Sequence, residues 1–107
     1  MTEKLNRVKE ALLKVTDATY HYEAHKAKEP YIVWAEETES GALYGDDQKL
    51  EQKLQGTADL FTKTDGDPLI DQVQEQFATA KISYKLNSVQ YEEETGMIHY
   101  EWIWEVD

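Results

Sequence analysis

Residues 56–77, GTADLFTKTDGDPLIDQVQEQF, decide how the rest of the chain is arranged. The first half of this stretch alternates, with Ala58 and Leu60 on one face and Phe61 among polar residues on the other. An alternation of period two is typical of a strand with one buried side. We therefore predict a strand over residues 52–62.

The second half of the stretch has the marks of a helix start. Asp67 can cap a helix because its carboxylate accepts a hydrogen bond from a free N–H group of the first turn. Pro68 suits the first helical position, and Gly66 lies in the turn before it. The following apolar residues repeat at helical spacing, which predicts a helix over residues 67–81 with one side on a sheet: Leu69, Ile70, Val73, Phe77 and Ala80.

The N-terminal half predicts one helix and two strands. Residues 3–15 repeat apolar side chains three and four apart, so they predict a surface helix, with Thr2 as its cap. Alternation over residues 19–25 predicts a first strand, and residues 31–39 predict a second one whose start is apolar on both faces. Residues 40–49 hold two glycines and two aspartates, which indicates a loop or a short strand pair outside the sheet.

A hairpin is expected at the C-terminal end. Residues 82–91 and 97–106 both favour strands, and the connection between them contains Gly96, which can adopt a positive φ. One face of the last strand is entirely apolar, whereas the other mixes Met97, His99 and Ile103 with glutamates. Together these elements predict a single α+β domain over residues 1–107. The expected sheet is mainly antiparallel, of about five strands, with two helices on one face in the order helix, strands, helix, hairpin.

Composition excludes several classes of protein. The 107 residues include 22 acidic and 11 basic ones, for a net charge of −11, and no cysteine. Residues 1–50 hold 10 acidic and 7 basic residues, and residues 51–107 hold 12 and 4. This acidity disfavours direct binding to nucleic acid, and the lack of cysteine excludes disulfides and thiolate metal sites. No segment is apolar enough to predict a membrane span or a secretion signal.

No pattern of an enzyme is present. His21 and His25 are too far apart on a strand to share one metal ion, and the sequence identifies no further ligands for a metal at His99. The carboxylates cluster at strand ends and loops, where solvated charge is the ordinary expectation. Phosphate loops, nucleophile motifs and calcium-loop spacing are missing. We therefore expect no enzymatic activity, no cofactor and no specific metal site, although the acidic loops leave weak binding of a divalent cation open.

Two segments carry a resemblance to a known group of proteins. GTADLFTKTDGDPLIDQVQEQF and ISYKLNSVQYEEETGMIHYEWIWEV, within a layout that spans residues 5–106, resemble the small tail-completion or tail-terminator proteins of long-tailed phages and of prophages in Gram-positive bacteria. The resemblance implies a structural protein that caps the tail tube as a ring, with a hexamer expected, and joins the tube to the head connector. Assembly is then expected in the host bacterial cytoplasm, and the final location in the tail or neck of the virion.

The implied partners are further copies of the chain, the tail tube protein and the head–tail connector protein. Ring contacts in this group are made by sheet edges and loops, so apolar residues at the expected loop tips are the candidate partner-binding residues: Leu43, Tyr44, Tyr91 and Met97. Residues 43 and 44 can equally fold back on the domain.

Two other functions remain open. An acidic module that imitates DNA or inhibits a host protein would carry regularly spaced carboxylates on one surface and would not self-assemble. A small-ligand binder would use the mixed face around His99 and Tyr31, and it would need a pocket that the sequence does not reveal.

Overall fold

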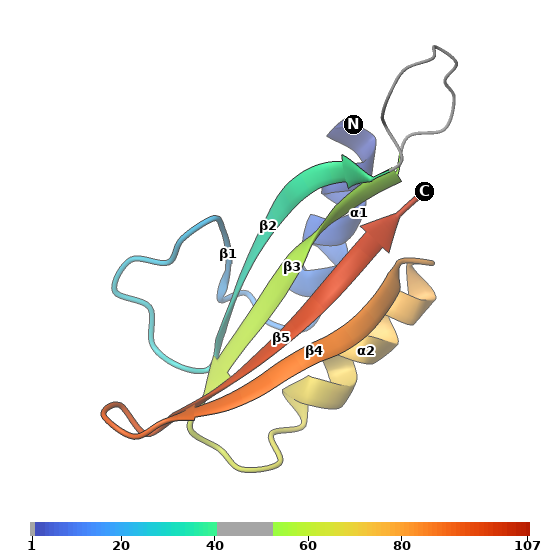
Figure 1. The fold of residues 1–107 in the computed structure, drawn as a ribbon. Coiled ribbons are helices and arrows are strands. Elements are labelled where there is room, and N and C mark those ends of the chain that lie inside the picture. Colours follow the sequence, from blue (N-terminus) through green and yellow to red (C-terminus); the bar gives the residue numbers. More distant parts are fainter. Residues whose placement is uncertain (1, 41–52) are drawn as a thin grey trace.

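The computed structural model describes residues 2–40 and 53–107. Within these residues, the chain forms a five-stranded sheet with two helices, which confirms the predicted α+β class (Figure 1). The strands lie side by side in the order β1-β2-β3-β5-β4, where β1 runs parallel to β2 and every other pair is antiparallel. The elements are α1 (Thr2–Leu13), β1 (Thr19–His21), β2 (Tyr31–Ser40), β3 (Lys53–Thr62), α2 (Leu69–Thr79), β4 (Ser83–Glu92) and β5 (Met97–Val106).

Both helices cover the same face of the sheet, hereafter the covered face (Figure 1). The core lies between them and this face, because the apolar stripe of each helix needs an apolar surface to pack against. The last strand contributes most, as its alternation predicts. The largest side chains removed from solvent are Trp102, Trp104, Phe77, Leu12, Ile32, Leu54 and Leu60.

The start of α2 follows the capping chemistry that the sequence predicts. Oδ1 of Asp67 accepts a hydrogen bond from the backbone N–H of Leu69 at 2.9 Å, and Pro68 already has helical angles of φ −60° and ψ −18°. The other carboxylate oxygen of Asp67 accepts the hydroxyl of Thr62 at 2.6 Å, where both side chains are buried. Asp67 therefore joins the end of β3 to the start of α2, and the helix proper begins at Leu69.

The end of α2 comes two residues before the predicted one. Lys81 has a φ of 60°, its N–H group donates to the carbonyl of Ala78, and the N–H of Ile82 donates to the carbonyl of Phe77 at 2.9 Å. This pair of bonds around a left-handed residue is the usual way to satisfy the last carbonyls of a helix. The arrangement turns the chain from α2 directly into β4.

The first two elements are shorter than the sequence predicts. α1 includes Thr2, which was expected to lie outside as the cap, and it ends at Leu13 rather than at residue 15. The strand predicted over residues 19–25 is wrong beyond His21, because Tyr22 has a φ of 75° and leaves the extended conformation. A tyrosine in this conformation is unusual, and its hydroxyl is bonded to a carboxylate described below.

Gly56 allows β3 to lie in the middle of the sheet beneath a large ring. It is paired with Glu36 on one side and Trp104 on the other. A β-carbon at this position would lie 2.2 Å from the carbonyl oxygen of Ala35 and 2.4 Å from the ring of Trp104. The indole N–H of Trp104 donates to the carbonyl of Thr57 at 2.8 Å, so the absent side chain makes room for a fixed tryptophan.

The C-terminal hairpin agrees with its prediction. β4 and β5 are joined by a short turn in which Gly96 has a φ of 74° and donates to the carbonyl of Glu92 at 2.8 Å. β5 then returns between β3 and β4, so it is bonded on both sides. The register between β4 and β5 shifts between Leu86 and Ser88, which marks a β-bulge at Asn87.

Candidate interaction surface

The face of the sheet opposite the helices, hereafter the open face, carries a row of stacked rings. Tyr31, Phe61 and His99 are direct cross-strand partners on β2, β3 and β5. The ring centroids of Tyr31 and Phe61 are 5.0 Å apart, and those of Phe61 and His99 are 4.3 Å apart. Tyr20 of β1 adds an edge-to-face contact with Tyr31 at 6.4 Å. We call these four residues the ring row.

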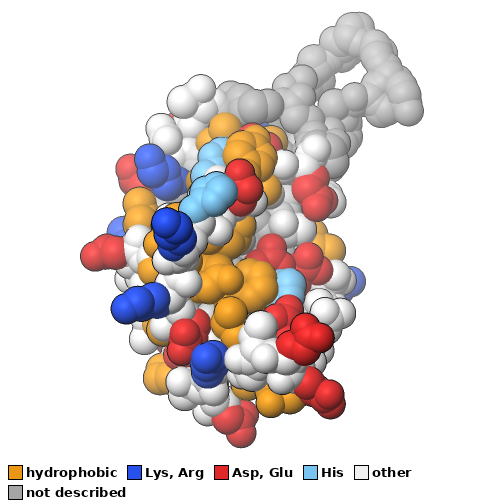
Figure 2. Space-filling view, turned by 90° about the vertical axis from the view of Figure 1, so that its left-hand side faces the viewer, with side chains coloured by type: hydrophobic (Ala, Val, Ile, Leu, Met, Phe, Trp, Pro, Cys, Tyr) orange, Lys and Arg blue, Asp and Glu red, His pale blue; other side chains and the backbone are white. Residues whose placement is uncertain are grey.

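The ring row is half-buried although both helices lie on the other side of the sheet. Flat rings in contact cover one another, so part of each ring is removed from solvent and the rest stays accessible. Figure 2 looks at the β1 side of the molecule and shows hydrophobic side chains gathered in the middle of that view, with histidine and acidic side chains beside them. The surface thus combines apolar contact area with negative charge.

Asp59 and His99 form a hydrogen-bonded contact within this face. Nε2 of His99 lies 2.7 Å from Oδ1 of Asp59, and the two side chains are only 22% and 16% exposed. Burial raises the pKa of Asp59, and the hydrogen bond from His99 opposes that rise. Glu101 lies directly opposite Asp59 and also raises its pKa, while the side-chain N–H of Asn87 donates to Glu101 at 2.9 Å. The open face therefore holds two adjacent carboxylates, each with a hydrogen-bond donor.

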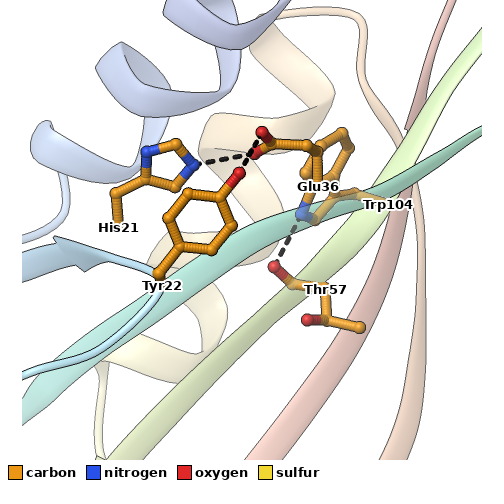
Figure 3. A network of polar contacts seen from close by, with 5 residues as sticks. All are labelled: His21, Tyr22, Glu36, Thr57 and Trp104. Carbon is orange, nitrogen blue, oxygen red and sulfur yellow. Dashed lines mark hydrogen bonds and ion pairs between the residues drawn. The ribbon is translucent and has the colours of Figure 1, made fainter.

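A second histidine–carboxylate pair lies at the rim of the covered face (Figure 3). Nε2 of His21 is 2.7 Å from Oε1 of Glu36, and the hydroxyl of Tyr22 donates to Oε2 of the same carboxylate. The imidazole of His21 is stacked between Tyr22 and Trp34, with centroids 4.0 Å away on each side. These contacts fix Tyr22 in its left-handed conformation and explain why β1 ends at His21.

The pKa of Glu36 reflects these two donors. Burial alone would raise it, but the hydrogen bonds from Tyr22 and His21 outweigh burial and lower it. The same hydrogen bond raises the pKa of Tyr22, because it is strongest when the phenol keeps its proton. The cluster is a fixed structural contact between β1 and β2.

The third histidine belongs to neither cluster. Nε2 of His25 is 3.4 Å from Oε2 of Glu23, and both side chains are largely exposed. In the part of the chain that the structure describes, no three histidine, aspartate or glutamate side chains converge as metal ligands would.

Of the four predicted partner-binding residues, the structure describes two, Tyr91 and Met97. Leu43 and Tyr44 lie outside the described residues. Tyr91 is 64% exposed and lies opposite Ile98, which places it on the same side as the helices. Met97 lies on the open face and is half-buried, so the hairpin brings Tyr91 and Met97 to the same end of the sheet but to opposite faces.

Sequence reasoning missed two features of this surface. The contact between Asp59 and His99 joins residues 40 positions apart, and only the strand register brings them together. The outer strand β4 also carries a row of exposed apolar side chains, which we call the β4 row. Its members are Tyr84, Leu86, Val89 and Tyr91. Their spacing of two, three and two residues was a signal for the bulge at Asn87.

Comparisons with known proteins do not assign the chain to a group. Among the residues that the structure describes, neither helix is long and apolar enough to cross a membrane. No protein-family model matches the chain, and no curated protein matches it.

Proposed function

We propose that the chain is a structural protein of a long-tailed phage or prophage, which closes into a ring, caps the tail tube and joins it to the head connector. The observation that carries this proposal is the ring row on the open face. It offers stacked aromatic area and paired carboxylates on a rigid sheet, which is the chemistry of a protein contact surface. The kind of assembly, a ring at the end of the tail tube, is inferred from the resemblance of the two long sequence segments.

A ring needs two different surfaces on each subunit, because a head-to-tail contact repeated around an axis closes only when the surfaces differ. The open face supplies one of them. Tyr20, Tyr31 and Phe61 give contact area at a low cost in side-chain entropy, since a tyrosine or phenylalanine has few rotatable bonds. Asp59 and Glu101 select a partner that presents hydrogen-bond donors or positive charge to this face.

The net charge of −11 supports the same role. A ring between head and tail surrounds the path of the DNA, and a negatively charged surface there repels the phosphate backbone. Met97 extends the open face toward the hairpin and remains a candidate contact. Leu43 and Tyr44 remain candidates from the sequence.

The experiment is a capture assay with purified tail tube protein and connector protein, combined with sedimentation velocity of the mixtures. We expect the wild-type chain to bind and to form a species of about six subunits on the tube, as the resemblance implies. Tyr31→Ala removes one ring from the centre of the ring row and should weaken capture at least tenfold, in line with the loss of a buried aromatic contact.

Tyr22→Ala is the control, because Tyr22 is a tyrosine with an accessible ring that lies outside the ring row. It should bind as the wild type does. Equal binding by the wild type and Tyr31→Ala would show that the open face is not the contact. A wild-type monomer that captures neither protein would overturn the proposal and favour an acidic inhibitor.

A further inference from the structure

The β4 row lies along a free strand edge. In the described part of the chain, β4 pairs with β5 on one side only, and it ends the strand order. The row faces the same side as the helices, because each member lies opposite a covered-face residue of β5. α2 covers it incompletely, although the rings of Phe77 and Tyr84 are 5.9 Å apart. The exposed fractions of the four side chains are 39% for Tyr84, 40% for Leu86, 52% for Val89 and 64% for Tyr91.

The bulge makes the pattern of β4 symmetric. Ser88 lies opposite Glu101, and the Asn87 side chain bonds Glu101, so residues 87 and 88 both point to the open face. Apolar residues therefore stand at equal distances on either side of the midpoint between Asn87 and Ser88. The segment YKLNSVQY has the same order of apolar and polar residues in both directions: tyrosine, polar, aliphatic, two polar residues, aliphatic, polar and tyrosine.

We propose that two copies of the chain pair along their β4 edges, antiparallel and about a two-fold axis at the midpoint between Asn87 and Ser88. Tyr84 then lies opposite the partner's Tyr91, and Leu86 lies opposite the partner's Val89. A two-fold contact requires a surface that is complementary to itself, and a strand with a symmetric face pattern meets that condition. The pairing extends the sheet across both copies and covers the β4 row.

The register is fixed by the same pattern. A shift by one residue would place the apolar members of one copy opposite open-face residues of the other, since side chains alternate between faces. A shift by two residues would leave Leu86 opposite the partner's Asn87, or Ser88 opposite the partner's Val89. Only the pairing about the midpoint matches faces along the whole strand.

Charge selects a second copy in this orientation. Lys81 lies in the turn before β4 and Lys85 lies near the start of the strand, whereas Glu92 lies at its end and Glu94 in the turn after it. Antiparallel pairing brings the turn that holds Lys81 beside the partner's turn that holds Glu94, and it places Lys85 diagonal to the partner's Glu92. Each contact occurs twice by symmetry, and diagonal neighbours on one face are close enough to interact. A parallel pairing would instead bring like charges together.

Cysteine pairs test the register directly, because the chain has no cysteine of its own. A mixture of Leu86→Cys and Val89→Cys chains, oxidised gently, should give a disulfide-linked dimer that contains one copy of each, since opposite residues lie about 5 Å apart. Leu86→Cys alone should cross-link at least tenfold less, because the two substituted positions are then about 10 Å apart.

The mixture of Leu86→Cys and Gln90→Cys is the matched control, since residue 90 points to the open face. It should cross-link as poorly as the single variant. Cross-linking of the control mixture as efficient as that of Leu86→Cys with Val89→Cys would overturn the proposed register.

Charge reversal tests the orientation on the free protein, by sedimentation equilibrium at low salt. Lys81→Glu should raise the dimer dissociation constant about tenfold, because it replaces two attractive contacts with repulsive ones. The double variant Lys81→Glu with Glu94→Lys should restore the wild-type value. A wild-type chain that remains monomeric at millimolar concentration, or a double variant as weak as the single one, would overturn the proposal.

These measurements use no tail or connector protein. Failure of the β4 dimer therefore leaves the ring proposal intact, and failure to bind the tube leaves the β4 dimer intact.

Discussion

The two phenylalanines of the chain lie on opposite sides of the sheet, and they show what each side contributes. Phe77 of α2 is fully removed from solvent in the core beneath the covered face. Phe61 of β3 is half-buried on the open face, stacked between Tyr31 and His99. Beneath the helices the covered face thus encloses its rings, whereas the open face holds its rings in a fixed row that solvent reaches. We therefore expect stability to depend chiefly on the first side, and the proposed binding of tail proteins to depend on the second.

Substitution of each phenylalanine by alanine should separate these roles. The loss of stability expected at Phe77 is the largest effect predicted for the chain. We expect Phe77→Ala to lower the free energy of unfolding by about 4 kcal/mol, because it removes a core ring and leaves a cavity. Phe61→Ala should lower it by only about 1 kcal/mol, because solvent already reaches that ring. Urea unfolding followed by tryptophan fluorescence measures both. Losses of equal size would mean that the open face is a second core.

Gly56→Ala tests the contact between the central strand and Trp104. The added methyl group meets the carbonyl of Ala35 and the indole ring, both held in place, so overpacking should cost about 3 kcal/mol. Gly96→Ala is the control: no atom lies within 4 Å of its added methyl group, and only its φ of 74° is unfavourable. It should cost about 1 kcal/mol. The interpretation fails if Gly56→Ala is as mild as Gly96→Ala.

The two histidine–carboxylate pairs should respond to pH with opposite signs, which is the smallest effect. The pKa of Glu36 is lowered on folding, so the stability it adds is present above its ordinary pKa and is lost as the pH falls through the folded value. The pKa of Asp59 is raised, so its ionisation opposes folding at neutral pH, and this penalty disappears as the pH falls through its folded pKa.

Comparison with neutral variants isolates each carboxylate. On going from pH 7 to pH 4, the wild type should lose stability relative to Glu36→Gln and gain stability relative to Asp59→Asn, each by less than about 1 kcal/mol. Unfolding by urea at a series of pH values gives both differences. Changes of the same sign would contradict the assignment, in which Glu36 faces Tyr22 and His21, and Asp59 faces His99 and Glu101.

Local sequence signals predict much of the fold. Gly66, Asp67 and Pro68 mark the start of α2 because each suits the backbone of one position in the turn and the cap. The alternation of β5 identifies the covered face, and Gly96 marks the hairpin. These features depend on neighbouring residues only, so a single sequence contains the information needed to predict them.

The features that were missed depend on distant residues. β1 stops at His21 because Tyr22 reaches across to Glu36, 14 positions away. The ring row and the Asp59–His99 contact arise only when β5 pairs with β3 in one register. The bulge at Asn87 is recognised from the pairing with β5. In the sequence alone, the spacing of the β4 row resembles an interrupted alternation. Tertiary contacts, rather than propensity, decide these positions.

The position of β5 has a consequence for synthesis on the ribosome. β5 is made after the other described strands, yet it lies between β3 and β4 and joins them. Before β5 emerges, β3 lacks one neighbouring strand, and β4 lacks the only neighbour that it has among the described strands. The apolar side chains of α1 and α2 then have no complete sheet to cover. A nascent chain is therefore open to wrong pairing and aggregation until β5 inserts. A holding chaperone that binds exposed apolar segments should improve the yield most when translation is slowed within β5.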